Sequence, residues 1–148
     1  MIIEKTVYKI PFSNRQHGKY NQPPKNASLF MNVEELREYC LSLKGTTECL
    51  PFDDVTLVLK VQGKMFALIP LARSETSISL KCDPERAITL REEYEAVVPA
   101  YHFNKKHWNT VSLDSRITRN LICEWIDHSY QLVVSGLPVK LREELIYL

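Results

Sequence analysis

Two apolar stretches separated by a two-residue turn place the strongest constraint on the fold. Residues 55–61 carry a valine or leucine at every second position, and residues 64–70 are again largely apolar. Gln62 and Gly63 between them have the length and the glycine of a tight hairpin turn. Residues 77–82 then alternate isoleucine, leucine and cysteine with serine and lysine, the pattern of a strand with one buried face. The chain therefore contains three consecutive antiparallel strands with one face directed to a core.

Helical patterns lie on both sides of these strands. Asn32 is followed three positions later by Glu35, a capping-box arrangement, and apolar residues then recur at helical spacing until Gly45. A second helix opens at Asp83, which precedes a proline, and it ends before Pro99. Both helices expose mainly charged side chains, so each is expected to bury only one face.

The rest of the chain completes a mixed fold. Residues 46–54 are interpreted as a connector, and residues 108–114 as a fourth strand. Ser115 is placed to cap a long helix over about 116–134 with a broad apolar stripe, and residues 140–148 form a final short helix. This order predicts an α+β fold, a two-layer sandwich with helices packed on one face of an antiparallel sheet.

Charge is distributed unevenly along the 148 residues. Residues 1–30 hold five lysines or arginines and one carboxylate, a net charge of +4, whereas residues 31–148 carry −3. We therefore expect an N-terminal basic arm over 1–30 and one folded domain over 31–148. Such an arm can track nucleic acid, but docking on its own domain or on a partner subunit, as in a homodimer, is the preferred interpretation. The charged N-terminus lacks the apolar run of a signal peptide, and no stretch is long enough to cross a membrane, so the expected location is the cytoplasm.

The residue types that hold metals are scattered. No two cysteines have CxxC spacing, so we expect buried thiols and no structural zinc site; they are Cys40, Cys49, Cys82 and Cys123. Asp53 and Asp54 are adjacent, and such a pair can bind a divalent cation, but no third ligand follows at a recognisable spacing. A solvated turn is the preferred interpretation, and no cofactor or metal is expected.

Residues 98–111 concentrate polar and aromatic groups as no other segment does. The stretch reads Val-Pro-Ala-Tyr-His-Phe-Asn-Lys-Lys-His-Trp-Asn-Thr-Val and joins the second helix to the fourth strand. Two histidines, two lysines, a tyrosine and a tryptophan thus fall in one turn region. Such a set indicates a functional surface, although it does not specify a reaction.

Several motifs in this chain resemble those of the MmcQ/YjbR family. The resemblance covers roughly residues 31–138, is most specific over 101–108, and rests on Pro51-Phe-Asp-Asp54, Lys60-Val-Gln-Gly-Lys-Met-Phe-Ala67, Leu80-Lys-Cys-Asp-Pro-Glu85, residues 98–111 and Trp125-Ile-Asp-His-Ser-Tyr130. It implies a CyaY-like, or frataxin-like, sandwich that is also compared with a "double wing" DNA-binding domain. It implies DNA binding as a function but supplies no agreed catalytic residues, and a shared fold alone does not transfer function.

The face of the sheet opposite the helices is the expected binding surface. Strand parity places Lys60, Lys81 and Trp108 there among serine and threonine hydroxyls, with the lysines of the 98–111 stretch at its rim. Such a surface can hold phosphates and stack a base, giving weak and largely non-sequence-specific DNA binding. The expected contacts are Lys60, Lys81, Lys105, Lys106, His107 and Trp108. A solvated sheet face has a similar composition.

Two other functions stay open. A protein-protein interaction module could use the same sheet face, with Trp108 as its anchor. A metal- or small-molecule-binding enzyme could use His102 and His107, with Tyr101, His102 and Asn104 lining a pocket. No nucleophile with a base at recognisable spacing and no glycine-rich phosphate loop supports the enzyme, so we expect a protein without catalytic residues.

Overall fold

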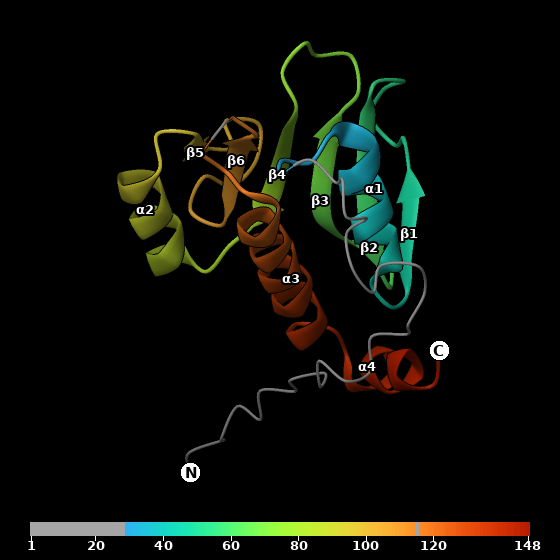
Figure 1. The fold of residues 1–148 in the computed structure, drawn as a ribbon. Helices are drawn as coiled ribbons and strands as arrows, with labels where there is room; N and C mark the ends of the chain where they lie inside the picture. The colour runs from blue at the N-terminus through green and yellow to red at the C-terminus, as the bar shows by residue number, and fades with distance from the viewer. Residues whose placement is uncertain (1–28, 115) are drawn as a thin grey trace.

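The computed structural model describes residues 29–114 and 116–148. Most of the expected basic arm, its homodimer contact and Ser115 therefore lie outside the described residues. Figure 1 shows the arrangement of helices and strands. In chain order the elements are α1 (Val33–Ser42), β1 (Thr46–Cys49), β2 (Thr56–Val61), β3 (Lys64–Pro70), β4 (Ser77–Lys81), α2 (Pro84–Glu93), β5 (Val97–Pro99), β6 (Trp108–Ser112), α3 (Arg119–Ser135) and α4 (Val139–Ile146).

One antiparallel sheet organises the domain, with strand order β1-β2-β3-β4-β6-β5. The predicted hairpin is β2 and β3, and Gln62 and Gly63 have positive φ angles of 49° and 77°. Two successive residues with positive φ are typical of a type I′ turn, whose twist matches that of the flanking strands. In Figure 1, α1 and α3 lie across the same face of the sheet. The predicted α+β architecture, helices packed on an antiparallel sheet, is confirmed.

The two edge strands are not predicted by the sequence. The interpretation of residues 46–54 as a connector is wrong for Thr46–Cys49, which forms β1 along β2. The second helix ends at Glu93, so Val97–Pro99 forms β5 beside β6. Each edge strand has only three or four residues, too few to display an alternating pattern. Pairing with a longer neighbour, a tertiary effect, determines their conformation.

Side-chain caps fix where the first three helices begin. The Asn32 side chain accepts a hydrogen bond from the Glu35 backbone nitrogen at 2.9 Å, and the reciprocal bond completes the predicted capping box of α1. Asp83 caps α2 by accepting from backbone nitrogens of its first turn. The long helix starts later than expected, at Arg119, because Thr118 accepts from the Leu121 backbone nitrogen at 3.3 Å. Each cap satisfies amide groups that the first helical turn leaves without partners.

The main core lies between the sheet and helices α1 and α3. Phe66 and Ile126 are completely buried, and the rings of Phe66 and Tyr130 meet edge to face with centroids 5.5 Å apart. The Tyr130 hydroxyl donates to the Lys44 carbonyl at 2.5 Å, and burial raises the pKa of Tyr130 to about 12. This packing leaves the polar faces of α1 and α3 on the outside of the molecule.

Helix α4 closes one end of the core through the turn between α1 and β1. Gly45 in that turn has a φ of +72°, a value that glycine adopts easily. A Cβ atom added to Gly45 would overlap Cδ1 of Leu145, a side chain that is 1% exposed. The Lys44 ammonium group also donates to the Ile146 carbonyl at 2.9 Å. The turn and the C-terminal helix are therefore in direct contact.

None of the helices among residues 29–114 and 116–148 has the length and apolarity needed to cross a membrane.

A bulge interrupts the regular pairing in the middle of the sheet. The β2–β3 register shifts between Leu59 and Lys60, so Leu59 pairs with Ala67 while Lys60 pairs with Met65. Phe66 is the extra residue, and both Phe66 and Ala67 are completely buried in the main core. The bulge thereby changes the face that the preceding residues occupy, and Met65 lies opposite Lys60 on the outer face.

Candidate functional site

Two of the predicted lysines lie on the outer face of the sheet, near the end that carries the Gln62–Gly63 turn. Lys60 pairs with Met65 across the hairpin, and Lys81 pairs with Trp108 across β4 and β6. Lys81 is one residue beyond the Ala67–Leu80 pair, so it stands nearly level with Lys60 two strands away. Since neighbouring strands are about 4.8 Å apart, roughly 10 Å separates the two backbone positions. The sheet thus holds two half-buried lysines in one row.

Trp108 is on the predicted face, but the expectation that it is exposed is wrong. Its side chain is 8% exposed and belongs to a second apolar cluster with Val58, Leu68 and Ala100. The Phe103 ring packs on the indole with centroids 5.4 Å apart and an interplanar angle of 35°. Strand parity gives the face of a residue but not whether a loop covers it. The apolar residues Val58, Leu68 and Phe103 were the signal in the sequence that a loop covers Trp108.

Loop 100–107, which joins β5 to β6, covers this outer cluster and is held to the body by Arg91 of α2. The Arg91 guanidinium donates to the Lys105 carbonyl and, through Nε, to Asn109 Oδ1 at 2.7 Å. Asn109 is 3% exposed and in turn donates to the Ala87 carbonyl at 3.3 Å. Arginine suits this position because its planar fork reaches several acceptors at once.

Asn104 organises the turn within the same loop. Its side-chain Oδ1 accepts from the Lys106 backbone nitrogen at 3.0 Å. Its backbone carbonyl accepts from the nitrogens of both His107 and Trp108, each at 3.0 Å. The His107 carbonyl accepts from Cys82 at 2.7 Å, which extends the β4–β6 pairing. Asn104 and the half-buried His107 therefore shape the loop through hydrogen bonds.

The loop presents the remaining predicted residues to solvent. Tyr101 is 68% exposed, and His102, Lys105 and Lys106 are also exposed. The Lys105 ammonium lies 4.9 Å from the centroid of the Tyr101 ring, a cation–π contact. Tyr101, His102 and Asn104, which the sequence suggests as a pocket lining, instead lie on the outside of the loop. They are exposed on the same loop as Lys105 and Lys106.

Positive and negative side chains are segregated between the layers. The four helices carry ten carboxylates and six lysines or arginines, whereas the six strands and loop 100–107 carry five lysines and one carboxylate, Glu48. Glu48 is bonded to Arg37 of α1 by two contacts of 2.6 Å. Within residues 29–114 and 116–148, neither Lys60 and Lys81 nor Lys105 and Lys106 form an ion pair with a carboxylate. The outer sheet face and its loop are therefore the basic side of the described structure.

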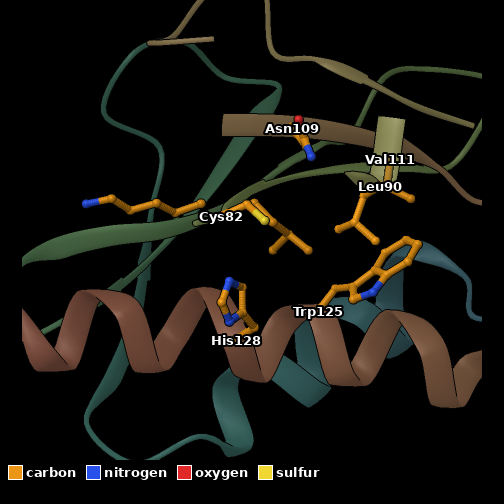
Figure 2. A pocket seen from close by; sticks show the side chains of 8 residues that line it. Cys82, Leu90, Asn109, Val111, Trp125 and His128 are labelled. Carbon is orange, nitrogen blue, oxygen red and sulfur yellow. The ribbon is translucent and has the colours of Figure 1, made fainter. Parts of the chain in front are cut away.

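A small pocket lies on the opposite side of the sheet, between β4, β6, α2 and α3. Figure 2 shows His128 and Trp125 rising from α3 toward Cys82 and Leu90, with Asn109 and Val111 on the far wall. His128 Nε2 accepts a hydrogen bond from the Asp83 backbone nitrogen at 3.2 Å. Burial, with Arg86 adding to it, lowers the pKa of His128. This imidazole is therefore neutral at pH 7 and contributes to the cap of α2.

The chemistry of this pocket is not that of a cysteine nucleophile. Burial raises the pKa of the Cys82 thiol, and a reactive cysteine requires a lowered pKa. His128 uses Nε2 to hold the chain at Asp83, which suits a structural role. The sequence offered no sign of this pocket, because its residues come from four separate elements. The pairing of the half-buried His128 with Asp83 could be seen only in three dimensions.

Asp53, the first residue of the acidic pair before β2, also has a structural role. Asp53 Oδ1 accepts from the backbone nitrogens of Val55 at 2.9 Å and Thr56 at 2.6 Å. These hydrogen bonds lower the pKa of Asp53, the Val55 amide contributing most. Asp53 thus closes the turn before β2, in agreement with the turn interpretation. In the part of the chain that the structure describes, no group of three or more histidine, cysteine or acidic residues is placed to hold a metal.

Comparison with known proteins identifies the family. The sequence model of the YjbR family matches residues 41–132. The chain is 35% identical over 118 residues to the uncharacterized protein YjbR of Escherichia coli K12, covering 80% of this chain and 100% of that protein. It is 36% identical over 104 residues to the uncharacterized protein YbdF of Escherichia coli O157:H7, covering 70% of this chain and 85% of that protein.

Solved structures agree with this assignment. The crystal structure of the Deinococcus radiodurans protein DR2400, a DUF419 domain, superposes with a TM-score of 0.74 at 40% identity, covering 80% of this chain and 90% of that one. A crystal structure from Pseudomonas syringae gives a TM-score of 0.60 at 28% identity, covering 69% and 98%. The motifs, the family match and these superpositions lead to one conclusion: the chain belongs to the YjbR family.

Proposed function

We propose that the protein binds DNA weakly and largely without sequence preference through its basic side. The single observation that carries this proposal is the position of Lys60, Lys81, Lys105 and Lys106. All four occur on the outer sheet face or on loop 100–107, and none of them is neutralised by a described carboxylate. Lysine ammonium groups bind phosphates as point charges, which gives affinity without reading base sequence.

The helical layer supports this orientation. Its excess of carboxylates repels a polyanion, so an approaching strand meets the sheet side first. The half-buried Lys60 and Lys81 lie opposite Met65 and Trp108 of the outer apolar cluster, while the exposed Lys105 and Lys106 belong to the loop. A small number of phosphate contacts gives modest affinity that falls steeply with salt.

The test is fluorescence anisotropy of labelled single-stranded and double-stranded DNA, titrated at two salt concentrations with the full chain. The double variant Lys105→Ala/Lys106→Ala should weaken binding and lower the salt slope by about 0.7–0.9 for each phosphate that the variant no longer neutralises. Lys106→Ala is compared with Lys140→Ala, which removes the same charge from exposed α4 and should leave binding unchanged. Equal reductions of affinity in these two single variants, or no binding at low salt, would overturn the proposal.

A second candidate function is docking of a protein partner, favoured by an apolar group at the opposite end of the sheet. Its side chains are 42–61% exposed and cluster where β1, β2 and β3 meet their loops; they are Leu50, Phe52, Val55 and Leu71. The Leu71 nitrogen donates to the Val55 carbonyl at 2.7 Å, which brings the two loops together. A co-purified partner that is absent from Phe52→Ser and retained by Lys105→Ala/Lys106→Ala would support this function.

A further inference from the structure

We infer that Tyr101 is a stacking platform for a nucleobase and that the nucleic acid held by the basic side is single-stranded. This inference rests on the proposed function and names its substrate class. It also moves the stacking role away from Trp108, whose two-ring surface is already covered by Phe103, Ala100 and the strands beneath. A buried indole has no face to offer a base.

Tyr101 has the accessibility that stacking requires. It is 68% exposed although the Lys105 ammonium lies 4.9 Å from the centroid of its ring. One face of the ring therefore has a cation beside it, and the large exposed fraction of the residue leaves room for a base on the opposite face. A base stacked on that face would have its own phosphates within the neighbourhood of Lys105 and Lys106.

The support beneath Tyr101 reduces the entropy cost of binding. Phe103, two residues away, is packed on Trp108, and its nitrogen donates to the Ala100 carbonyl at 3.1 Å. Arg91 holds the carbonyl of Lys105 on the other side of the turn. Because the loop is already ordered by these contacts, little conformational freedom remains to be given up when a base stacks.

The geometry selects single strands over duplexes. In a duplex each base is stacked between its neighbours, so its faces are closed to a protein side chain unless the base is flipped out at a cost of a few kcal/mol. A single strand exposes its bases and has a flexible backbone. Such a strand can follow the lysine row at Lys60 and Lys81 while one base lies on Tyr101.

The experiment compares an oligothymidylate of about twelve nucleotides with an abasic oligonucleotide of equal length, which keeps the phosphates and lacks the bases. Both are titrated against wild type, Tyr101→Ala and Tyr101→Phe by anisotropy at low salt. Tyr101→Ala should weaken oligothymidylate binding on the order of tenfold, to the level of the abasic strand, while Tyr101→Phe retains it. Tyr147→Ala removes another tyrosine that is 88% exposed and should change nothing.

The outcomes separate the two proposals. Equal affinity for both oligonucleotides, unchanged by Tyr101→Ala, would overturn base stacking and leave phosphate binding in place. Tighter binding of a duplex of the same length would overturn the single-strand assignment. Failure of both oligonucleotides to bind at low salt would overturn the proposed function itself and this inference with it.

Discussion

The hydroxyl of Ser129 donates a hydrogen bond to the backbone carbonyl of Phe66 over 2.6 Å, linking α3 to the bulge in β3. The same oxygen accepts from the Lys81 backbone nitrogen at 2.9 Å. A completely buried serine thus bridges β3 and β4 one residue beyond the Ala67–Leu80 pair. The sequence places Ser129 in an otherwise apolar stripe, and the structure explains why a hydroxyl is present there.

Ser129→Ala should therefore lower the free energy of unfolding by roughly 2–4 kcal/mol, because two buried backbone groups would be left without this partner. Urea denaturation measures the change. The control is Ser135→Ala on the same helix, where the exposed hydroxyl donates to the Leu132 carbonyl at 2.9 Å. That substitution should cost less than about 0.5 kcal/mol. Similar costs in both variants would contradict the bridging role.

Trp108 should behave as a core residue. Trp108→Ala is expected to destabilise the protein by roughly 3–5 kcal/mol, since it leaves a cavity beneath Phe103. Trp108→Phe retains an aromatic ring and should cost less. At a temperature where both proteins are folded, the proposed DNA binding should be equal in Trp108→Phe and wild type. A variant that folds normally but no longer binds would instead indicate that Trp108 touches the ligand directly.

Arg91 should act as a positioning residue for loop 100–107. Arg91→Lys keeps the charge but cannot reach the Lys105 carbonyl and Asn109 together, so the loop should loosen while the core persists. Hydrogen exchange of the amides at 103–108 should accelerate relative to the strands. The control is Arg86→Lys. In wild type the Arg86 guanidinium bonds to Glu124 on the surface at 2.8 Å, away from the loop, so this substitution should leave the loop amides protected. Uniform acceleration throughout the sheet would point to general destabilisation.

His128 should make the protein sensitive to mild acid. Its pKa in the folded chain is lowered by burial and by Arg86, below the unfolded value of about 6.5. The unfolded state therefore binds more protons as the pH falls below about 6.5, and stability should decline over that range. NMR titration of the His128 ring gives the folded pKa directly. His128→Gln cannot be protonated at this position, so it should remove the part of the acid destabilisation that His128 causes. An unchanged profile of stability against pH would contradict this role of His128. The nearby carboxylates of Asp83 and Glu124 act in the opposite direction and limit how far the pKa of His128 is lowered.

The long elements could be predicted because their patterns are local. Gln62 and Gly63 mark the hairpin, Asn32 with Glu35 marks the start of α1, and alternation marks β4. The edge strands β1 and β5 could not, because three or four residues have no period and acquire strand geometry only from β2 and β6. The largely apolar residues 64–70 also gave no sign of the bulge at Phe66, which places two successive side chains on one face.

The candidate surface was only half predictable. Parity correctly placed Lys60, Lys81 and Trp108 on the outer face, and the lysines of the 98–111 stretch are exposed as expected. Parity carries no information about loops that fold back, so the burial of Trp108 and the prominence of Tyr101 were missed. The anchoring by Arg91 depends on hydrogen bonds between residues 14 and 18 positions apart, beyond the reach of any local pattern.

The close approach of Gly45 to Leu145 restricts which amino-acid substitutions can be tolerated at position 45. A mutation at position 45 meets both an unfavourable backbone angle and the side chain of Leu145, so a smaller residue at 145 would relieve only the second obstacle. We expect glycine to be retained wherever the terminal helix docks on this turn, and to become replaceable only by residues such as asparagine where that helix is absent. A substitution at position 45 should therefore require two changes at once, a residue that tolerates a positive φ and a smaller side chain at position 145, a hundred residues away.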